Sequence, residues 1–464
     1  KYFDSISVNY AGNENAHFYI DEIYVFADPQ FDNYVPEPVV SQDDDYTVGI
    51  NICSLWREGT HFGWDKVSAY DEIKPLLGFY DEGVPEVMDW EIKWMTEHGI
   101  DFQLFCWYAS SSNTPMMHTH LFDALMNGYM NAKYSDMMKF AILWECANAA
   151  RPESSEDFRT IFVPYWVEHF LSDDRYMTID GKALIAVFGA DQLINSLGGA
   201  EECAKEFDYL DEICKELGYE GAMYIVCSGT SNAGSLKNLK NAGFDAVYAY
   251  NWGKTGYDPD YTKDAILAQV EQDIIHVVPT LSTGFNNVGW AGTRSPNMNL
   301  TDFASLLRYF RDDLLESYNQ DNWESEFIML STWNEFGEGT YITPSGLNGF
   351  GYVDEIRKQF GNTTVEHSDI TPDDEAMKRF TQMYSPYRNT LEPLYRYTPE
   401  FKGELYDGWY FDDPEDRAKW GISFGIDTYE ETDTSITGSS SASDYAIKCT
   451  DMSDMDINLD DMAC

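Results

Sequence analysis

The sequence predicts an α/β fold, a (β/α)8 TIM barrel, with partial β-sandwich segments at both ends of the chain. Residues 46–396 contain eight short, almost continuously apolar runs, as expected of parallel strands that are buried on both faces. Helix-like segments separate these runs, and aromatic and polar residues follow several of them. A doubly wound open sheet is the alternative, but no GxGxxG or GxxxxGK[ST] motif follows a run, which counts against nucleotide binding.

The expected strands contain six to eight residues each and are rich in aromatic and β-branched side chains. In order they are Tyr46–Cys53, Asp101–Tyr108, Met138–Trp144, Ala183–Phe188, Ala222–Cys227, Phe244–Tyr250, Ile275–Thr280 and Phe327–Trp333.

The expected helices lie between these strands. Pro85–His98 has apolar residues at helical spacing, among them Val87, Trp90 and Trp94. The other helices are expected near Leu121–Lys133, Phe158–Leu171, Ala200–Leu217, Ser235–Ala242, Asp264–Gln272 and Asp302–Glu316.

The two ends differ from this barrel in composition. Residues 1–30 resemble the end of a carbohydrate-binding β-sandwich module, and 31–45, rich in Pro and Asp, resemble a linker. Residues 397–464 form a second β-rich, carbohydrate-binding-like segment. Either the ends are fragments of flanking modules in a longer multidomain chain, or they form one small sandwich together.

The charge limits the partners. Acidic residues outnumber basic ones 80 to 30, giving a net charge of −50, which argues against nucleic acid and anionic membrane surfaces. Aromatic residues make up 16% of the chain, which suits either a core or the binding of sugar faces. We expect an oligo- or polysaccharide partner, no cofactor, and a monomer.

The location is expected to be extracellular, secreted or at the cell surface. No run of 18 apolar residues predicts a spanning helix. Because the sequence begins at Lys1, any signal peptide is expected to lie outside it. The eight cysteines show no CxxC spacing, and Cys53, Cys106, Cys146 and Cys227 follow the strand pattern. These four are expected to be buried free thiols.

Chemistry in such a barrel is expected at the carboxyl ends of the strands. Aromatic, amide and carboxylate side chains gather there. The candidate substrate-binding residues are Trp56, His61, Trp107, Tyr108, Trp144, Glu145, Asn148, Tyr250, Trp252, Trp290, Trp333, Asn334 and Tyr341.

The strongest single signal is the stretch Ser331–Gly339, STWNEFGEG, after the eighth strand. Glu335 and Glu338 are three residues apart, with Gly337 and Gly339 allowing a tight turn between and after them. Glycoside cleavage commonly needs one protonated and one ionised carboxyl group. These two glutamates are therefore the candidate catalytic pair of a sugar-active enzyme.

Other chemistries fit less well. His118 and His120 are the only close histidine pair, and a helix start explains them as well as a metal does. Ser231 lies in a glycine loop whose spacing is wrong for a nucleophile elbow. The acidic tail lacks the spacing of an EF-hand loop, so we expect metal-independent chemistry.

Three segments carry a family resemblance: Pro85–Tyr108, Lys139–Asn148 and Thr332–Thr340. In that order they resemble the WbsX-like family, which is related to glycoside hydrolase family 99, the endo-α-mannosidases and endo-α-mannanases. The resemblance covers roughly residues 46–390. It implies a (β/α)8 barrel and retaining, metal-free cleavage of an α-linked, mannan-like glycan.

The resemblance also implies roles for the two glutamates. Glu335 would assist the sugar's own 2-hydroxyl in displacing the leaving group through a 1,2-anhydro sugar, and Glu338 would be the general acid and then the general base. The sequence departs from the family at Phe336, where a Trp is usual, and at Gly337, where a His is usual. These changes bear on mannose specificity more than on the reaction type.

Two other functions remain open at this point. The WbsX name carries a glycosyltransferase label, so the chain could build a surface polysaccharide as a glycosyltransferase or transglycosylase. It could also be a non-catalytic glycan-binding barrel. The sugar, the linkage, and endo or exo action are not determined by the sequence.

Overall fold

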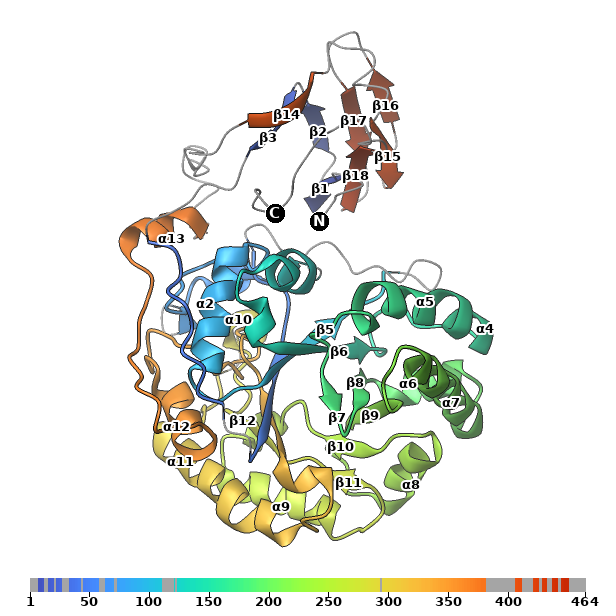
Figure 1. Ribbon diagram of the computed structural model, residues 1–464, viewed down its shortest axis with the longest axis vertical. Coiled ribbons are helices and arrows are strands. Elements are labelled where there is room, and N and C mark those ends of the chain that lie inside the picture. Colours follow the sequence, from blue (N-terminus) through green and yellow to red (C-terminus); the bar gives the residue numbers. More distant parts are fainter. Residues whose placement is uncertain are drawn as a thin grey trace. The chain divides into compact units, whose positions relative to one another are not determined.

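The computed structural model divides the chain into two compact units, residues 35–390 and residues 1–34 with 391–464. It describes residues 33–380 except 43–44, 58–62, 71–72, 111–120, 122 and 293, together with the backbone of eight strands near the two ends. Figure 1 shows the first unit as a ring of strands surrounded by helices.

The ring confirms the predicted (β/α)8 barrel. Neighbouring strands are parallel throughout, and β13 pairs with β4, Phe327 opposite Thr47, so that the last strand meets the first. In order the strands are β4(Thr47–Ile52), β5(Phe102–Trp107), β6(Lys139–Glu145), β8(Lys182–Phe188), β9(Ala222–Cys227), β10(Ala246–Tyr248), β11(His276–Val277), β12(Thr280–Ser282) and β13(Phe327–Ser331). A short strand, β7(Thr178–Ile179), pairs antiparallel with β8.

The seventh barrel position consists of two short strands, β11 and β12. β11 pairs with β10 and β12 pairs with β13, while Val278 and Pro279 lie between them. Pro279 has no N–H to donate, but its carbonyl still accepts from Met329 N at 2.9 Å. The interruption therefore leaves the ring closed, although the predicted strand Ile275–Thr280 ended two residues too early.

Helices follow the strands as expected, with shifted ends and several π-helical turns. The longer helices are α2(Pro85–Thr96), α7(Ala200–Glu216), α8(Ala233–Asn241), α9(Pro259–Val270), α11(Leu300–Tyr309) and α12(Gly351–Phe360). The shorter ones are α1(Trp64–Val67), α4(Ser155–Asp157), α5(Val163–Trp166), α6(Ala190–Ser196), α10(Val288–Ala291) and α13(Asp374–Phe380). The π-helical segments are η2(Asp123–Gly128), η5(Phe158–Phe162), η6(Val167–Leu171) and η8(Phe310–Leu315). The 3₁₀ turns are η3(Tyr129–Asn131), η4(Ser135–Met137), η7(Gly253–Thr255) and η9(Trp323–Glu326).

Helix α2 is buried on all sides, from Glu86 to Thr96. Residues 35–42, expected to be linker, lie against it: Ser41 N donates to Thr96 O at 2.9 Å, and Val39 N donates to Glu97 Oε1 at 2.9 Å. On the other side, Trp94 Nε1 donates to Ile370 O at 2.9 Å. Two irregular segments thus cover the face of α2 that the barrel leaves open.

The two chain ends pair with each other. β1(Ser7–Ala11) pairs with β18(Asp444–Cys449), β2(Ala16–Ile20) with β17(Ile436–Ser440), and β3(Glu22–Phe26) with β14(Leu405–Tyr410), all antiparallel. β15(Trp420–Phe424) pairs with β18, and β16(Thr428–Glu431) with β17. The ends therefore contribute strands to common sheets, and a carbohydrate-binding role for them stays a prediction.

The cysteines of the barrel are free, as the sequence predicts. Cys53, Cys106 and Cys146 are buried, and Cys227 is half-buried at the end of β9. None of the described helices combines the length and the apolar character needed to cross a bilayer.

Candidate active site

The loop after β13 is fixed to its neighbours by main-chain and side-chain hydrogen bonds. Trp333 N donates to Asn51 O at 2.8 Å, and Asn334 Oδ1 accepts from Cys53 N at 2.8 Å, so the loop is tied to β4. Thr332 N donates to Thr340 O at 2.6 Å, which closes the loop on itself. Residues 332–340 therefore form a short closed turn at the carboxyl ends of the strands.

The loop's two glycines allow close approach from the segment after β12. A Cβ on Gly337 would lie 2.0 Å from Trp290 Cε2, and one on Gly339 would lie 2.7 Å from Asn286. Gly339 also has φ 69°, in the left-handed region. Asn286 N donates to Glu338 O at 2.6 Å. The half-buried Trp290 ring thus lies over the backbone between the two glutamates.

The side chains of Glu335 and Glu338 are held by adjacent residues of one neighbouring loop. After β10, Tyr250 Oη donates to Glu335 Oε2 at 3.3 Å, and Asn251 Nδ2 donates to Glu338 Oε2 at 3.3 Å. Glu335 is buried and Glu338 is partly exposed. Glu335 Oε1 is buried with no hydrogen-bond partner. The structure therefore brings together the predicted pair and the predicted Tyr250.

Burial raises the pKa of both carboxyl groups above the ordinary glutamate value. For Glu335 the negative charge of Glu338 raises the pKa further, while contacts with Cys53 and Tyr250 lower it. For Glu338 burial alone raises it. The two groups titrate as a pair, and two carboxylates that share a site disfavour a second charge. The pair therefore keeps a proton to higher pH than exposed glutamates would.

Tyr108 and Trp252 follow β5 and β10, at the same end of the barrel as the pair. Tyr108 is half-buried, and the charge of Glu335 contributes, after burial, to raising its pKa. Trp252 is buried, with Nε1 donating to Thr280 O at 2.8 Å. Its ring lies beside Gly229. Ser228, Thr230 and other residues after β8 and β9 line a hollow of about 590 Å³. The same face of the barrel thus offers both the carboxyl pair and open space.

Four tryptophans expected to line the cleft are instead placed in the core. Trp56, Trp107, Trp144 and Trp333 have no exposed surface. Trp107 and Trp144 pack edge-on against Trp166 with ring centroids 5.7 and 4.7 Å apart. Rings that are fully covered by protein cannot present a face to a sugar, so in this structure these residues belong to the core.

Glu145, Asn148, Asn334 and Tyr341 also have structural partners. Glu145 accepts from the backbone N–H groups of residues 147, 148 and 149, so its carboxylate organises the loop after β6. Asn148 is exposed and its side chain donates to Glu145 at 3.2 Å. Asn334 and Tyr341 are buried in the β13 loop. His61 lies outside the described residues, as do His118 and His120.

Sequence reasoning missed two buried acids beneath the loop. Glu91 of α2 is buried, which raises its pKa to about 7, while contacts with Trp333 and Tyr80 partly offset this. Glu82 is buried and accepts from Ser54 Oγ at 2.7 Å. The signal for Glu91 was available, because it lies four residues after Val87 and four before Met95 on the apolar face of the helix.

The comparisons with known proteins agree with this architecture. A family model described as Glycosyltransferase WbsX matches residues 70–265. The chain is similar to the WbsX family over these residues. No curated protein matches the sequence.

Two solved structures are similar in fold. One is a glycoside hydrolase-like protein, with a TM-score of 0.52 and 17% identity, covering 71% of this chain and 98% of that chain. The other is the GH99 endo-alpha-mannosidase from Bacteroides thetaiotaomicron in complex with BIS-TRIS-Propane, with a TM-score of 0.50 and 16% identity over 68% of this chain and 96% of that chain. The resemblance to WbsX and family 99 barrels is thus confirmed, and at these identities it establishes the fold.

Proposed function

We propose that this protein is a retaining, metal-independent glycoside hydrolase that cleaves within an α-linked, mannan-like glycan. The observation that carries the proposal is the pair of shielded carboxyl groups, Glu335 and Glu338, on one short loop at the carboxyl end of the barrel. Tyr250 and Asn251, adjacent in sequence, each donate to one of them. A pair that keeps one proton near neutral pH can supply an acid and a base together.

The proposed roles follow the family resemblance. Glu335 takes the proton of the sugar 2-hydroxyl as O2 attacks C1, and Glu338 protonates the departing glycosidic oxygen. A 1,2-anhydro sugar forms. Glu338 then removes a proton from water as that water attacks C1, and O2 regains its proton from Glu335. Two displacements at C1 leave the anomeric configuration unchanged.

The partly exposed Trp290 supports substrate binding in this scheme, because its ring lies over the backbone between the two glutamates. The hollow over β8 and β9 gives room for further sugar units. We further propose a secreted or cell-surface location, a monomeric state, and a longer multidomain chain in which the end unit binds carbohydrate.

The deciding experiment compares Glu338→Gln and Glu335→Gln with the unchanged protein on a panel of α-linked glycans, with products read by mass spectrometry. We expect hydrolysis to fall about 10²–10⁴-fold, the usual contribution of general acid–base catalysis, while glycan affinity persists. Glu201→Gln, the same substitution at an exposed glutamate of α7, is the control. Turnover close to wild type in both glutamine variants would refute the assignment.

A glycosyltransferase or transglycosylase is the second candidate, because the matching family model is described as a glycosyltransferase. Products formed with and without a nucleotide sugar distinguish the two. Chain extension that requires the nucleotide sugar would favour the transferase, and release of shorter glycans without it favours the hydrolase. Binding without either product would favour a non-catalytic glycan-binding barrel.

A further inference from the structure

A second cluster of polar side chains lies at the amino end of the barrel strands, opposite the carboxyl pair. His98 comes after α2 and four residues before the first residue of β5. Asp354 is in the first turn of α12, and His367 and Asp369 lie in the irregular segment that follows this helix. The four side chains each offer one ligand atom, and these atoms all lie within 4.8 Å of one another. We refer to them as the His98 cluster.

His98 has the geometry of a histidine prepared to bind a cation. It is fully buried, and its Nδ1 faces Trp94 O at 2.5 Å, where a proton on Nδ1 makes a hydrogen bond. That bond leaves the lone pair on Nε2, and Nε2 is buried without a hydrogen-bond partner. A backbone carbonyl that fixes the tautomer in this way is the common outer-shell arrangement around metal-bound histidines.

The carboxylates of Asp354 and Asp369 lie at distances from His98 Nε2 that suit two ligands of one metal ion. Asp369 Oδ1 lies 3.5 Å and Asp354 Oδ1 lies 3.7 Å from His98 Nε2, too far for good hydrogen bonds. A tetrahedral ion with bonds of about 2.0–2.2 Å holds its ligand atoms about 3.3–3.6 Å apart. The distance to Asp369 falls within this range, and the 3.7 Å distance to Asp354 lies just above it.

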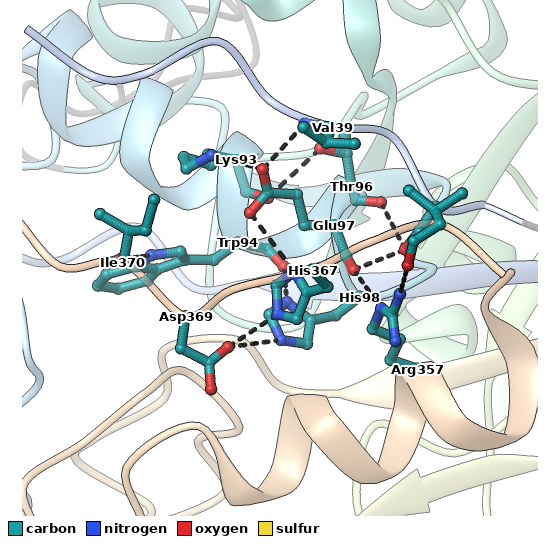
Figure 2. Close-up of polar contacts among 12 residues, drawn as sticks. Val39, Lys93, Trp94, Thr96, Glu97, His98, Arg357, His367, Asp369 and Ile370 are labelled. Carbon is teal, nitrogen blue, oxygen red and sulfur yellow. Dashed lines mark hydrogen bonds and ion pairs between the residues drawn. The ribbon is translucent and has the colours of Figure 1, made fainter. Parts of the chain in front are cut away.

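The second histidine completes the set. His367 lies with its ring centroid 4.5 Å from that of His98, edge to face, and its Nε2 is 2.8 Å from Asp369 Oδ1. Figure 2 shows both imidazole rings facing the Asp369 carboxylate. On binding an ion, this hydrogen-bonded pair has to open by about half an ångström to reach tetrahedral spacing. That is a small movement for an exposed aspartate on an irregular segment.

Two other charged groups lie near the cluster, the Glu97 carboxylate, whose Oε2 is 3.9 Å from His367 Nδ1, and the Arg357 guanidinium. The Glu97 carboxylate pairs with Lys93, and Arg357 donates to Glu97 O at 3.2 Å and to Val365 O at 2.6 Å. The two aspartates face two imidazoles, and with both imidazoles neutral a divalent cation would balance the two carboxylate charges. Two nitrogen and two carboxylate ligands suit Zn²⁺ far better than Mg²⁺ or Ca²⁺, which prefer oxygen.

We infer that His98, Asp354, His367 and Asp369 form a structural zinc site. The ion would join the segment that follows α2 to the first turn of α12 and hold the irregular segment 362–373 against α2. A site with four protein ligands is closed, as structural zinc sites are, and its place at the amino end separates it from the proposed hydrolysis. The inference does not depend on the proposed function.

The test measures metal content and thermal stability of the untagged full chain. After chelator treatment and dialysis, one equivalent of Zn²⁺ should bind, and saturating Zn²⁺ should raise Tm by at least about 3 °C. Mg²⁺ should give no shift. Co²⁺ in place of Zn²⁺ should give the strong visible absorption of a four-coordinate ion.

Asp369→Asn and His367→Gln alter side chains on the irregular segment, so both variants are expected to fold and to lose the bound ion and the Tm shift. His276→Gln, at a histidine bonded to Glu324, is the matched control and should keep both. Unchanged zinc stoichiometry in both segment variants would overturn the inference. A wild-type chain that binds no zinc would also overturn the inference. In that case a protonated His98 between the two aspartates would hold the cluster together.

Discussion

At the scale of single residues, the surroundings of Glu335 and Glu338 matter more than their spacing. An E-x-x-E pair on a solvent-exposed helix would be two ordinary glutamates. Here one carboxyl is buried, the other is partly covered, and each has one donor, on Tyr250 or Asn251. Burial and mutual repulsion raise the pKa of the pair, which gives these residues a chemical property that the sequence motif alone does not contain.

The first prediction concerns the pH dependence of hydrolysis. The proposed reaction needs one protonated and one ionised carboxyl, so kcat/KM should be bell-shaped, with both limbs above the ordinary glutamate pKa. Tyr250→Phe removes a contact that lowers the pKa of Glu335, so the bell should move to higher pH. A pH profile with its acid limb at the ordinary glutamate value, unaltered by Tyr250→Phe, would contradict this.

The second prediction concerns Gly337. A Cβ there would meet the Trp290 ring at 2.0 Å, so Gly337→Ala must displace either the ring or the loop. A displacement of about 1 Å at reacting groups can cost about 10²-fold in rate, and we expect kcat/KM for glycan hydrolysis to fall by about that factor. Gly229→Ala is the control, because its Cβ would make an ordinary contact with Trp252 at 3.7 Å. Equal activities of the two variants would show that the ring does not restrict the loop.

Some of the aromatic residues that the sequence predicts to bind substrate are buried and others are partly exposed, and there is a physical reason why the sequence does not distinguish them. Aromatic residues at strand ends suit both a sugar platform and a core, and composition does not separate these uses. Trp290 lies in the short helix α10 after β12 and is half-buried, whereas Trp107 ends β5 and is covered by η5, α5 and η6. Whether a neighbouring helix covers a ring depends on tertiary packing.

At the scale of elements, α2 shows what the spacing of apolar residues can and cannot predict about a helix. The apolar spacing located the helix within two residues of its observed end. It did not indicate that the outer face is covered too, because residues 35–42 and 362–373 that cover it have no periodic pattern. The presence of Glu91 on the apolar face signalled a buried acid, although its contacts with Trp333 and Tyr80 arise from the barrel.

The third prediction concerns the aromatic cluster formed by Trp107, Trp144, Trp166 and the phenylalanines around them. Trp166 is fully buried and packs edge-on against both other tryptophans. Trp166→Ala should lower the free energy of unfolding by about 3–5 kcal/mol, as expected for deleting a large core side chain. Urea denaturation measures it, with the half-buried Trp323→Ala as the control expected to cost less. A loss below about 1 kcal/mol would mean that the cluster is not part of the core.

At the scale of the whole molecule, the net charge of −50 is the dominant electrostatic property. Acidic groups repel one another across the surface, and this repulsion destabilises the compact state at low ionic strength. It also disfavours polyanionic partners, which agrees with a neutral glycan as the proposed substrate.

The fourth prediction follows from this charge. The Debye length falls from about 30 Å at 0.01 M to about 10 Å at 0.1 M salt, so NaCl should raise Tm by several degrees in this range and have little effect beyond it. Differential scanning calorimetry at constant pH measures the shift, and KCl should give the same result. A Tm that is flat or falls between these concentrations would contradict the dominance of self-repulsion.

The sequence by itself determined the class of fold and the position of the carboxyl loop, because buried parallel strands must be apolar along their whole length and the polar residues that follow them must meet at one end. Only the tertiary structure decided which aromatic rings remain exposed, which donors hold Glu335 and Glu338, and that His98 meets Asp354, His367 and Asp369. These relations join residues far apart in the chain, and they depend on how helices and irregular segments pack around the ring of strands rather than on any local pattern.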